Sequence, residues 1–337
     1  MELIRRRAYA RAGLVGNPSD GYHGRTLSVI VPHFFAEVVL YEWEELEIIL
    51  SRDDRSRFPS IDELSHDVEL HGYYGGVRLI KATIRRFYQY CRQNNLPLHE
   101  RTFSIRYESN IPRAVGLAGS SAIIVATLRA LMDFYHVTIP LEVQPSLALS
   151  VETQELKIPG GLQDRVVQIY EGLVFMDFSK EHTQVQAGMA YGVYERLDPT
   201  LLPSLYVAFS DEAGEPTEAA HGPLRARYDA GDPDVRQAMT GFAGLTDQAR
   251  DALQTEQPDA LAQIMDDNFD LRQSICDLAP FHVRMIETAR AAGASAKFAG
   301  SGGAIVGTFT DGAMQDKLTR DLTAIGCRIV YPDFRTG

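Results

Sequence analysis

The chain has 337 residues and a formal net charge of −12, with 45% hydrophobic and 23% charged residues. This composition is that of an ordinary globular protein long enough for two domains, and its acidity argues against a general binder of nucleic acid or anionic membrane. No run of about 18 apolar residues occurs, and the basic N-terminus lacks the apolar stretch of a secretory signal. The three cysteines are far apart, which favours free thiols in a reducing cytoplasm.

The first half of the chain mixes strand and helix patterns. Apolar, β-branched runs with polar breaks predict strands, and apolar residues at helical spacing predict helices. In chain order the expected elements are strands at Leu27–Val31, Ala36–Tyr41 and Leu46–Leu50, an amphipathic helix over 77–91, a strand at Thr102–Tyr107 and a buried helix at Ser120–Tyr135.

A second block begins near residue 195, where we place a boundary between domains 1–195 and 196–337. The polar stretch Asp211–Asp234 is rich in charges, Gly and Pro, and it predicts a loop or lid. The other expected elements are a strand at Leu205–Phe209, helices over 235–254, 258–278, 281–292 and 312–325, a glycine turn between strands within 296–307, and a last strand at Cys327–Tyr331. This order suggests an α+β layer domain.

The segment Pro112–Ala122 is the most informative part of the sequence. Its small residues allow the backbone to wrap closely around a phosphate, and the helix that follows directs its free N–H groups into the loop. The loop carries no lysine, so it is not a Walker A loop. An ordinary helix cap after a turn is the simpler alternative for this segment alone. The candidate phosphate-binding residues are Pro112, Gly116, Leu117, Ala118, Gly119, Ser120, Ser121 and Ala122.

Three further segments carry candidate site residues. Arg11–Asp20 holds small and polar residues that could line a pocket, although Asn-Pro-Ser-Asp also reads as a plain turn. Ser150–Arg165 carries Glu152 and places Asp164 at a helix start after a glycine turn, where an aspartate often only complements the helix dipole. Gly300–Gly303 joins two strands and either approaches a ligand by its backbone or forms a tight hairpin.

Together these four segments supply the parts that phosphoryl transfer requires. One loop would hold the phosphates, a hydroxyl and a carboxylate would hold Mg²⁺, and an aspartate would orient an alcohol. Competing chemistries lack their signatures, since the sequence contains no His-Glu-x-x-His, no Cys/His cluster and no Gly-x-Ser-x-Gly elbow.

At this point the chain resembles the GHMP kinases, whose three motifs match 11–20, 112–122 and 297–304 in the family's order. The resemblance implies an α+β, two-domain fold, with a ribosomal protein S5 domain 2-like N-terminal domain and a ferredoxin-like C-terminal domain. Within the family, the segments Gly13–Asp20, Gly72–Arg78 and Gly161–Arg165 are similar to those of the glucuronokinase branch, which makes glucuronic acid 1-phosphate from glucuronic acid and ATP.

The resemblance also implies residue roles. Asp164 would be the catalytic base and Arg11 would lie near the transferred phosphate, while Ser121 and Glu152 would bind Mg²⁺. The candidate substrate-binding residues are Asp20, Tyr73, Gln163, Arg165, Gly302 and Gly303. The expected cofactors are ATP and Mg²⁺, and the expected partner is a small sugar, with no nucleic acid and no membrane. The protein is expected to be cytoplasmic and to act as a monomer or homodimer.

Two departures from the family pattern bear on the substrate. Gly16-Asn17-Pro18-Ser19-Asp20 replaces the Gly-Glu-His-Thr-Asp of galactokinases, which argues against galactose, and the phosphate loop is one residue longer before its serines. The substrate alternatives are galactose, galacturonate, a heptose or a mevalonate-type alcohol, and the remaining alternative is a catalytically silent sugar or nucleotide sensor. A uronate carboxylate needs a cation, for which Arg25, Arg78, Arg113 and Arg165 are candidates.

Overall fold

The computed structural model describes residues 3–49, 75–210 and 217–333. The N-terminal half is built on a six-stranded sheet with the order β3-β4-β2-β5-β8, to which β1 adds by pairing with β2. All pairs are antiparallel except β3 with β4. The strands are β1 (Leu3–Val15), β2 (Arg25–Trp43), β3 (Glu47–Ile48), β4 (Thr102–Ser109), β5 (Leu173–Asp177) and β8 (Val193–Leu197).

The long strand β2 differs from the sequence prediction of two strands at Leu27–Val31 and Ala36–Tyr41. In β1, Tyr9 pairs with Phe35 and Ala10 with Val31, so residues 32–34 form a bulge inside one continuous strand. Pro32 lies in this bulge, where its missing N–H costs no ladder hydrogen bond. The predicted strand at Leu46–Leu50 shortens to two residues, and Leu50 itself lies outside the described residues.

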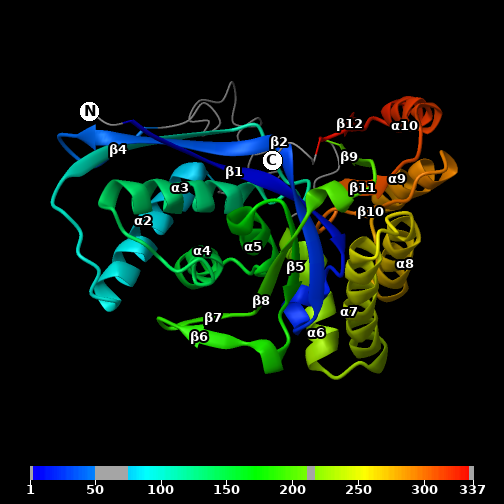
Figure 1. The fold of residues 1–337 in the computed structure, drawn as a ribbon, viewed down its shortest axis with the longest axis horizontal. Coiled ribbons are helices and arrows are strands. Elements are labelled where there is room, and N and C mark those ends of the chain that lie inside the picture. Colours follow the sequence, from blue (N-terminus) through cyan, green and yellow to red (C-terminus); the bar gives the residue numbers. More distant parts are fainter. Residues whose placement is uncertain (1–2, 50–74, 211–216, 334–337) are drawn as a thin grey trace, which may run out of the picture.

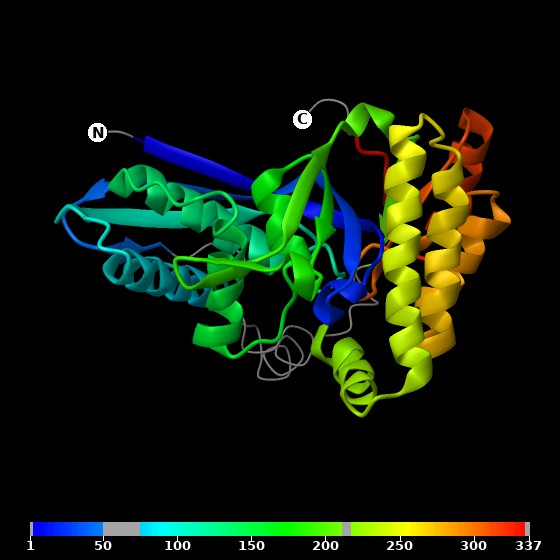
Figure 2. The same ribbon diagram turned by 60° about the horizontal axis from the view of Figure 1, so that its bottom comes forward.

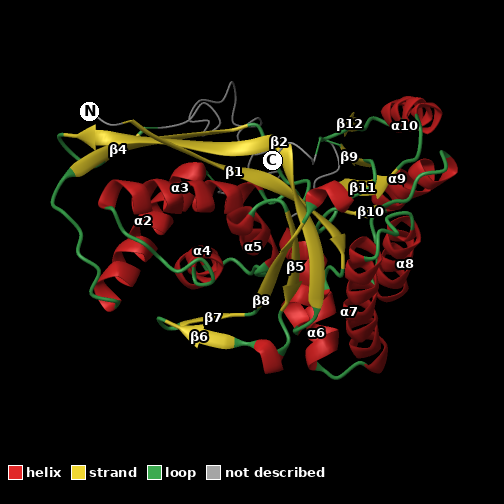
Figure 3. Ribbon diagram, in the orientation of Figure 1, coloured by secondary structure: helices red, strands yellow, loops and turns green. Residues whose placement is uncertain are grey.

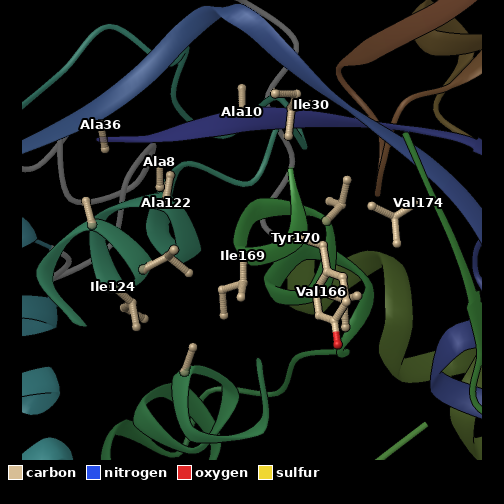
Figure 4. Close-up of a cluster of buried hydrophobic side chains, with 14 of the residues drawn as sticks. Ala8, Ala10, Ile30, Ala36, Ala122, Ile124, Val166, Ile169, Tyr170 and Val174 are labelled. Atoms are coloured by element: carbon tan, nitrogen blue, oxygen red, sulfur yellow. The ribbon is translucent and has the colours of Figure 1, made fainter. Parts of the chain in front are cut away.

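Four helices cover one face of this sheet (Figures 1 and 3). The central helix α3 packs against β1 and β2, and its neighbours α2 and α5 flank it. Figure 4 shows the resulting core, in which alanines of β1 and α3 face each other and Ile169 and Val166 of α5 fill the space beside them. The helices are α2 (Gly76–Gln93), α3 (Gly119–Tyr135), α4 (Gln144–Ser150) and α5 (Gln163–Tyr170).

The C-terminal half contains a four-stranded antiparallel sheet with the order β10-β11-β9-β12. Helices α7 and α8 run side by side next to this sheet, and α7 also packs against β2 of the first half (Figure 2). The strands are β9 (Leu205–Phe209), β10 (Lys297–Phe298), β11 (Ala304–Thr308) and β12 (Arg328–Val330), and the helices are α7 (Pro233–Gln254), α8 (Ala260–Ile275), α9 (Pro280–Ala291) and α10 (Gly312–Ala324).

One further local prediction was wrong. The expected loop over Asp211–Asp234 contains the helix α6 (Thr217–Asp229), with Pro223 inside it, and Asp232 then caps α7 by accepting from the N–H of Asp234. The glycine, proline and charged residues of this segment do not predict a helix. Tertiary packing stabilises it, since Leu224 is buried with residues of α7. The helix that carries Glu152 changes from α4 to a π-helical turn, η2 (Val151–Leu156), before it ends.

Three other sequence expectations can be placed on the structure. The chain passes from the first sheet to the second between Leu197 and Leu205, and the division at residue 195 stays a prediction. Within the described residues, no helix is long and apolar enough to cross a membrane. All three cysteines are free thiols, and Cys91 and Cys327 are buried.

Candidate active site

The phosphate-loop segment forms a tight turn that leads into α3. Gly116 has a φ of 74°, and Ala118, at the N-cap position, has a φ of 63° in the left-handed region. No side chain at the cap position accepts a hydrogen bond from α3. The first N–H groups of the helix therefore point into the loop. The left-handed Ala118 turns the chain into the helix, and the anion-binding geometry of a helix N-terminus is kept.

The two loop serines have different surroundings. The hydroxyl of Ser120 donates to Oε1 of Glu152 at 3.0 Å, whereas the hydroxyl of Ser121 is buried and donates to the carbonyl of Ala118 at 3.1 Å. The structure therefore brings Ser120 rather than Ser121 to Glu152. Mg²⁺ commonly takes one or two protein oxygens besides phosphate oxygens and water. A carboxylate and a hydroxyl beside a phosphate loop are such a donor set.

Arg11 of β1 joins three of the four segments. Its Nε donates to Oδ1 of Asp164 at 2.6 Å, and its Nη1 donates to the carbonyls of Gly116 at 2.6 Å and Ala299 at 3.1 Å. The Arg11 side chain is 7% exposed and that of Asp164 is 23% exposed. Asp164 is therefore held by a buried cation on one oxygen, and its side chain stays partly exposed.

Arg165 connects Glu152 to the Asp164 region. Its Nη2 forms an ion pair with Oε2 of Glu152, and its Nη1 donates to the carbonyl of Gly161 at 2.8 Å. Nη1 also lies 3.5 Å from Oδ2 of Asp164. Burial, together with the nearby charge of Arg11, lowers the pKa of Arg165 to about 10, which leaves it a cation at neutral pH.

Asp20 lies in the short helix η1 (Ser19–Tyr22), next to the glycine turn that precedes α5. Its carboxylate occupies the space where a side chain on Gly161 would be. Burial, reinforced by the Asp164 carboxylate and opposed by Arg11, raises the pKa of Asp20 from 3.8 to about 6. Gln163 is buried with its Nε2 next to Gly13, and its Oε1 has no hydrogen-bond partner within the described part of the chain.

The glycine turn of the C-terminal half lies directly against the first two segments. Gly13 donates its N–H to Ala299 at 2.8 Å, and Gly302 and Gly303 have φ values of 149° and 81° that favour glycine. A Cβ on Gly116 would lie 3.1 Å from the N atom of Ser301, so the two glycine turns are in contact.

Three buried residues of the site region were not among the sequence-predicted site residues. Lys297 is fully enclosed and donates to the carbonyls of Gly13 and Phe298 and to Oδ1 of Asn17 at 2.6 to 2.7 Å. Burial, with the nearby charges of Arg272 and Arg11, lowers the pKa of Lys297 well below its usual value. Arg272 lies in the same region on α8.

The third residue is Asn268, a buried polar residue on the largely apolar face of α8. It accepts the N–H of Gly16 at 2.6 Å and so fixes the first segment to α8. A polar residue on an apolar helix face was the one signal for Asn268. A lysine at the start of a predicted strand gave no comparable signal.

The remaining sequence candidates are placed as follows. Tyr73 lies outside the described residues. Of the arginines considered for a uronate carboxylate, Arg25 pairs with Asp177 at 3.0 Å and with Asp247 at 2.8 Å, so it is already neutralised. Arg165 is likewise paired with Glu152. Neither is therefore a free cation for a substrate.

Comparisons with known proteins agree with this geometry. Residues 78–172 match the sequence profile of the GHMP kinases N terminal domain. Over 324 residues the chain is 41% identical to glucuronokinase 1 of Arabidopsis thaliana, covering 94% of this chain and 88% of that protein. The chain belongs to the GHMP kinase family. It is therefore a kinase, a phosphotransferase with an alcohol group as acceptor.

Solved structures of this GHMP kinase family share the fold. The galactokinase of Lactococcus lactis complexed with galactose has a TM-score of 0.77 at 14% identity. The match covers 100% of this chain and 94% of that one. The phosphomevalonate kinase of Streptococcus pneumoniae, in complex with phosphomevalonate and AMPPNP, has a TM-score of 0.76 at 16% identity, covering 98% and 99%. The expected α+β GHMP kinase fold is thus confirmed.

Proposed function

We propose that this GHMP kinase phosphorylates the anomeric C1 hydroxyl of glucuronic acid, with ATP and Mg²⁺, to give glucuronic acid 1-phosphate. The observation that carries the proposal is the ion pair of Arg11 with Asp164, located where the motif-one strand, the phosphate loop and the motif-three turn meet. The identity of 41% to a glucuronokinase over nearly the whole chain supports this acceptor above the other alcohols of the family.

Asp164 is the proposed base. Its Oδ1 is fixed by Arg11, so the rotation of the carboxylate is restricted. Oδ2, which lies 3.5 Å from Nη1 of Arg165, is the oxygen proposed to accept the proton of the sugar hydroxyl. A positioned general base of this kind contributes about 10²- to 10⁴-fold to a rate. Arg11 and the start of α3 supply positive charge next to the transferred phosphoryl group, where most of the acceleration arises from positioning and electrostatics.

Asp20 and Gln163 are the proposed sugar-binding residues. Both flank Asp164, and the orphaned Oε1 of Gln163 is a buried acceptor that a sugar hydroxyl would satisfy. With a pKa near 6, the Asp20 carboxyl is mostly ionised at neutral pH and accepts hydroxyl hydrogen bonds.

Glu152 is the proposed acidic ligand of Mg²⁺, together with a hydroxyl of the serine pair. The contact between Ser120 and Glu152 favours Ser120, and Ser121 stays the ligand predicted from the motif. When bound, the cation would neutralise phosphate charge during transfer. Arg165 holds Oε2 of Glu152 and so presents Oε1 toward Ser120 and the phosphate loop.

The experiment is a steady-state assay of ATP consumption with glucuronic acid, with its neutral analogues glucose and glucuronamide, and with galactose, galacturonate, a heptose and mevalonate. The proposal predicts a much higher kcat/KM for the uronate than for either analogue. An equal or higher kcat/KM with galactose, a heptose or mevalonate would keep the kinase mechanism and overturn the proposed acceptor.

A further inference from the structure

Arg272 of α8 is a buried arginine with an unusual set of partners. Its Nη1 donates to the carbonyl of Gly300 at 2.8 Å and its Nη2 to the carbonyl of Ser301 at 3.0 Å, and its guanidinium lies 5.1 Å from the ring centre of Phe298. It is 4% exposed, and no carboxylate of the described residues lies within ion-pair distance of it. A buried charge without an acidic partner is costly, which makes this placement a candidate for function.

These two hydrogen bonds determine the direction of the turn's peptides. The peptide bonds of residues 300–302 are trans, so each N–H points opposite to the preceding carbonyl. Because both carbonyls face α8, the N–H groups of Ser301 and Gly302 face away from it. No acceptor for these two N–H groups occurs among the residues that the structure describes. Successive N–H groups of this kind form an anion-binding concavity.

The opposite side of the turn faces the catalytic groups. The N atom of Ser301 adjoins Gly116 of the phosphate loop, and a Cβ on Gly300 would lie 2.9 Å from Nη1 of Arg11. The N–H group of Ser301 therefore lies beside the phosphate loop, and that of Gly302 follows it on the same side of the turn. Arg272 also interacts electrostatically with Asp20, a proposed sugar-binding residue.

We propose that Arg272 is a positioning residue that fixes the motif-three turn, so that the N–H groups of Ser301 and Gly302 bind the oxygens of the phosphoryl group in transfer. The inference rests on the proposed phosphoryl transfer at this site and adds a residue that does not touch the substrate. Arg272 holds the carbonyl groups of Gly300 and Ser301, and the N–H groups on the other side of the turn bind the phosphoryl oxygens.

The test compares Arg272→Met and Arg272→Lys with Arg290→Met. Arg290, on α9, pairs with Asp266 and Asp270 of the same helix α8 and lies against Phe269, but it does not contact the turn. It therefore reports the effect of losing an arginine that packs on α8. Thermal melts identify any variant that does not fold. If Arg272→Met does not fold, Arg272→Lys still allows the test.

Loss of a preorganised donor set typically lowers kcat by about 100-fold. We expect this fall in Arg272→Met, a smaller fall in Arg272→Lys, KM for ATP within about threefold of the wild type, and partial rescue of Arg272→Met by millimolar guanidinium. Arg290→Met should keep its kcat. A tenfold or greater weakening of metal-free pyrophosphate binding in Arg272→Met, measured by titration calorimetry, is the readout that does not depend on turnover.

Equal losses in Arg290→Met and Arg272→Met would show that the effect is structural and overturn the inference. A rise of KM for the uronate alone, with kcat unchanged, would make Arg272 a direct contact of the sugar carboxylate and also overturn it. If the wild type does not use a uronate, the proposed acceptor fails, but the pyrophosphate comparison still decides the role of Arg272.

Discussion

The guanidinium of Arg11 and the carboxylate of Asp164 form an ion pair with 2.6 Å between Nε and Oδ1, although 153 residues separate them along the chain. Arg11 belongs to the first strand and Asp164 to the first turn of α5, so the pair exists only when the sheet and its helix layer are assembled. The same guanidinium reaches Gly116 and Ala299, which makes it the residue that connects the motif loops.

Asp164→Asn should lower kcat by about 10²- to 10⁴-fold, because an amide cannot accept the proton of the sugar hydroxyl. The amide oxygen still accepts from Nε of Arg11, so the site should stay assembled and the dissociation constant of ATP should change little. Steady-state kinetics and nucleotide titration measure the two quantities. Loss of ATP binding in a folded variant would contradict the role of Asp164 as a base.

Ser120→Ala and Ser121→Ala form a matched pair for the metal site. From the contact with Glu152, we expect Ser120→Ala to raise the Mg²⁺ concentration for half-maximal activity by about tenfold, since a ligand or its immediate partner is lost. Ser121→Ala should have the smaller effect, because its hydroxyl donates to the loop backbone. The reverse order in Mg²⁺ titrations would favour Ser121 as the ligand, as the motif predicts.

Asp20→Asn should stabilise the fold at alkaline pH. The pKa of Asp20 is raised to about 6, so its ionised form disfavours folding, and the penalty is absent below the unfolded pKa of 3.8, grows between 3.8 and 6, and is complete above 6. A shift of about two pKa units corresponds to about 3 kcal/mol. Urea unfolding at pH 8 and pH 4 measures the difference, which should be about 3 kcal/mol at most at pH 8 and should be small at pH 4, where the penalty has only begun to grow.

The same variant should raise KM for the sugar, because an acceptor of hydroxyl hydrogen bonds is weakened. A destabilised Asp20→Asn at pH 8 would show that the attraction of Arg11 and Arg165 outweighs burial. An unchanged KM would remove Asp20 from the sugar site.

Gly300→Ala should destabilise the protein by about 1–3 kcal/mol and lower its activity, because the new Cβ would meet the carbonyl of Gly116 and the guanidinium of Arg11. Gly312→Ala is the matched control, since it lies at the start of α10 with no heavy atom of the described structure within 4 Å of the added Cβ. Thermal melts and kcat measure both variants. Equal behaviour of the two would contradict the close contact of the motif loops.

The sequence predicted the parts of the molecule that depend on local pattern. The buried helix after the phosphate loop and the strand Leu205–Phe209 were predicted nearly to the residue, because the apolar pattern that defines each is local. The continuous strand β2 was missed because Pro32 reads as a break, and only the pairing with β1 shows that it lies in a bulge. The helix α6 was missed because its stability comes from packing on α7.

The candidate site likewise contains residues that local sequence predicts and residues that only tertiary contacts reveal. Short sequence segments predicted Arg11, Glu152 and Asp164 as site residues, and their assigned roles stay predictions. Arg272 and Lys297 were missed because each is an ordinary charged residue in a local pattern, and the burial that distinguishes them depends on contacts with residues far away in the sequence. The partner of Glu152, Ser120 rather than Ser121, likewise depends on how the helix start is wound.

An assay of ATP consumption with glucuronic acid as acceptor, with the product identified by ³¹P nuclear magnetic resonance and with Asp164→Asn as the control, decides whether this site phosphorylates the C1 hydroxyl. We expect glucuronic acid 1-phosphate as the product, and its loss in the variant. Phosphate at another hydroxyl, or turnover that the variant retains, would contradict this expectation.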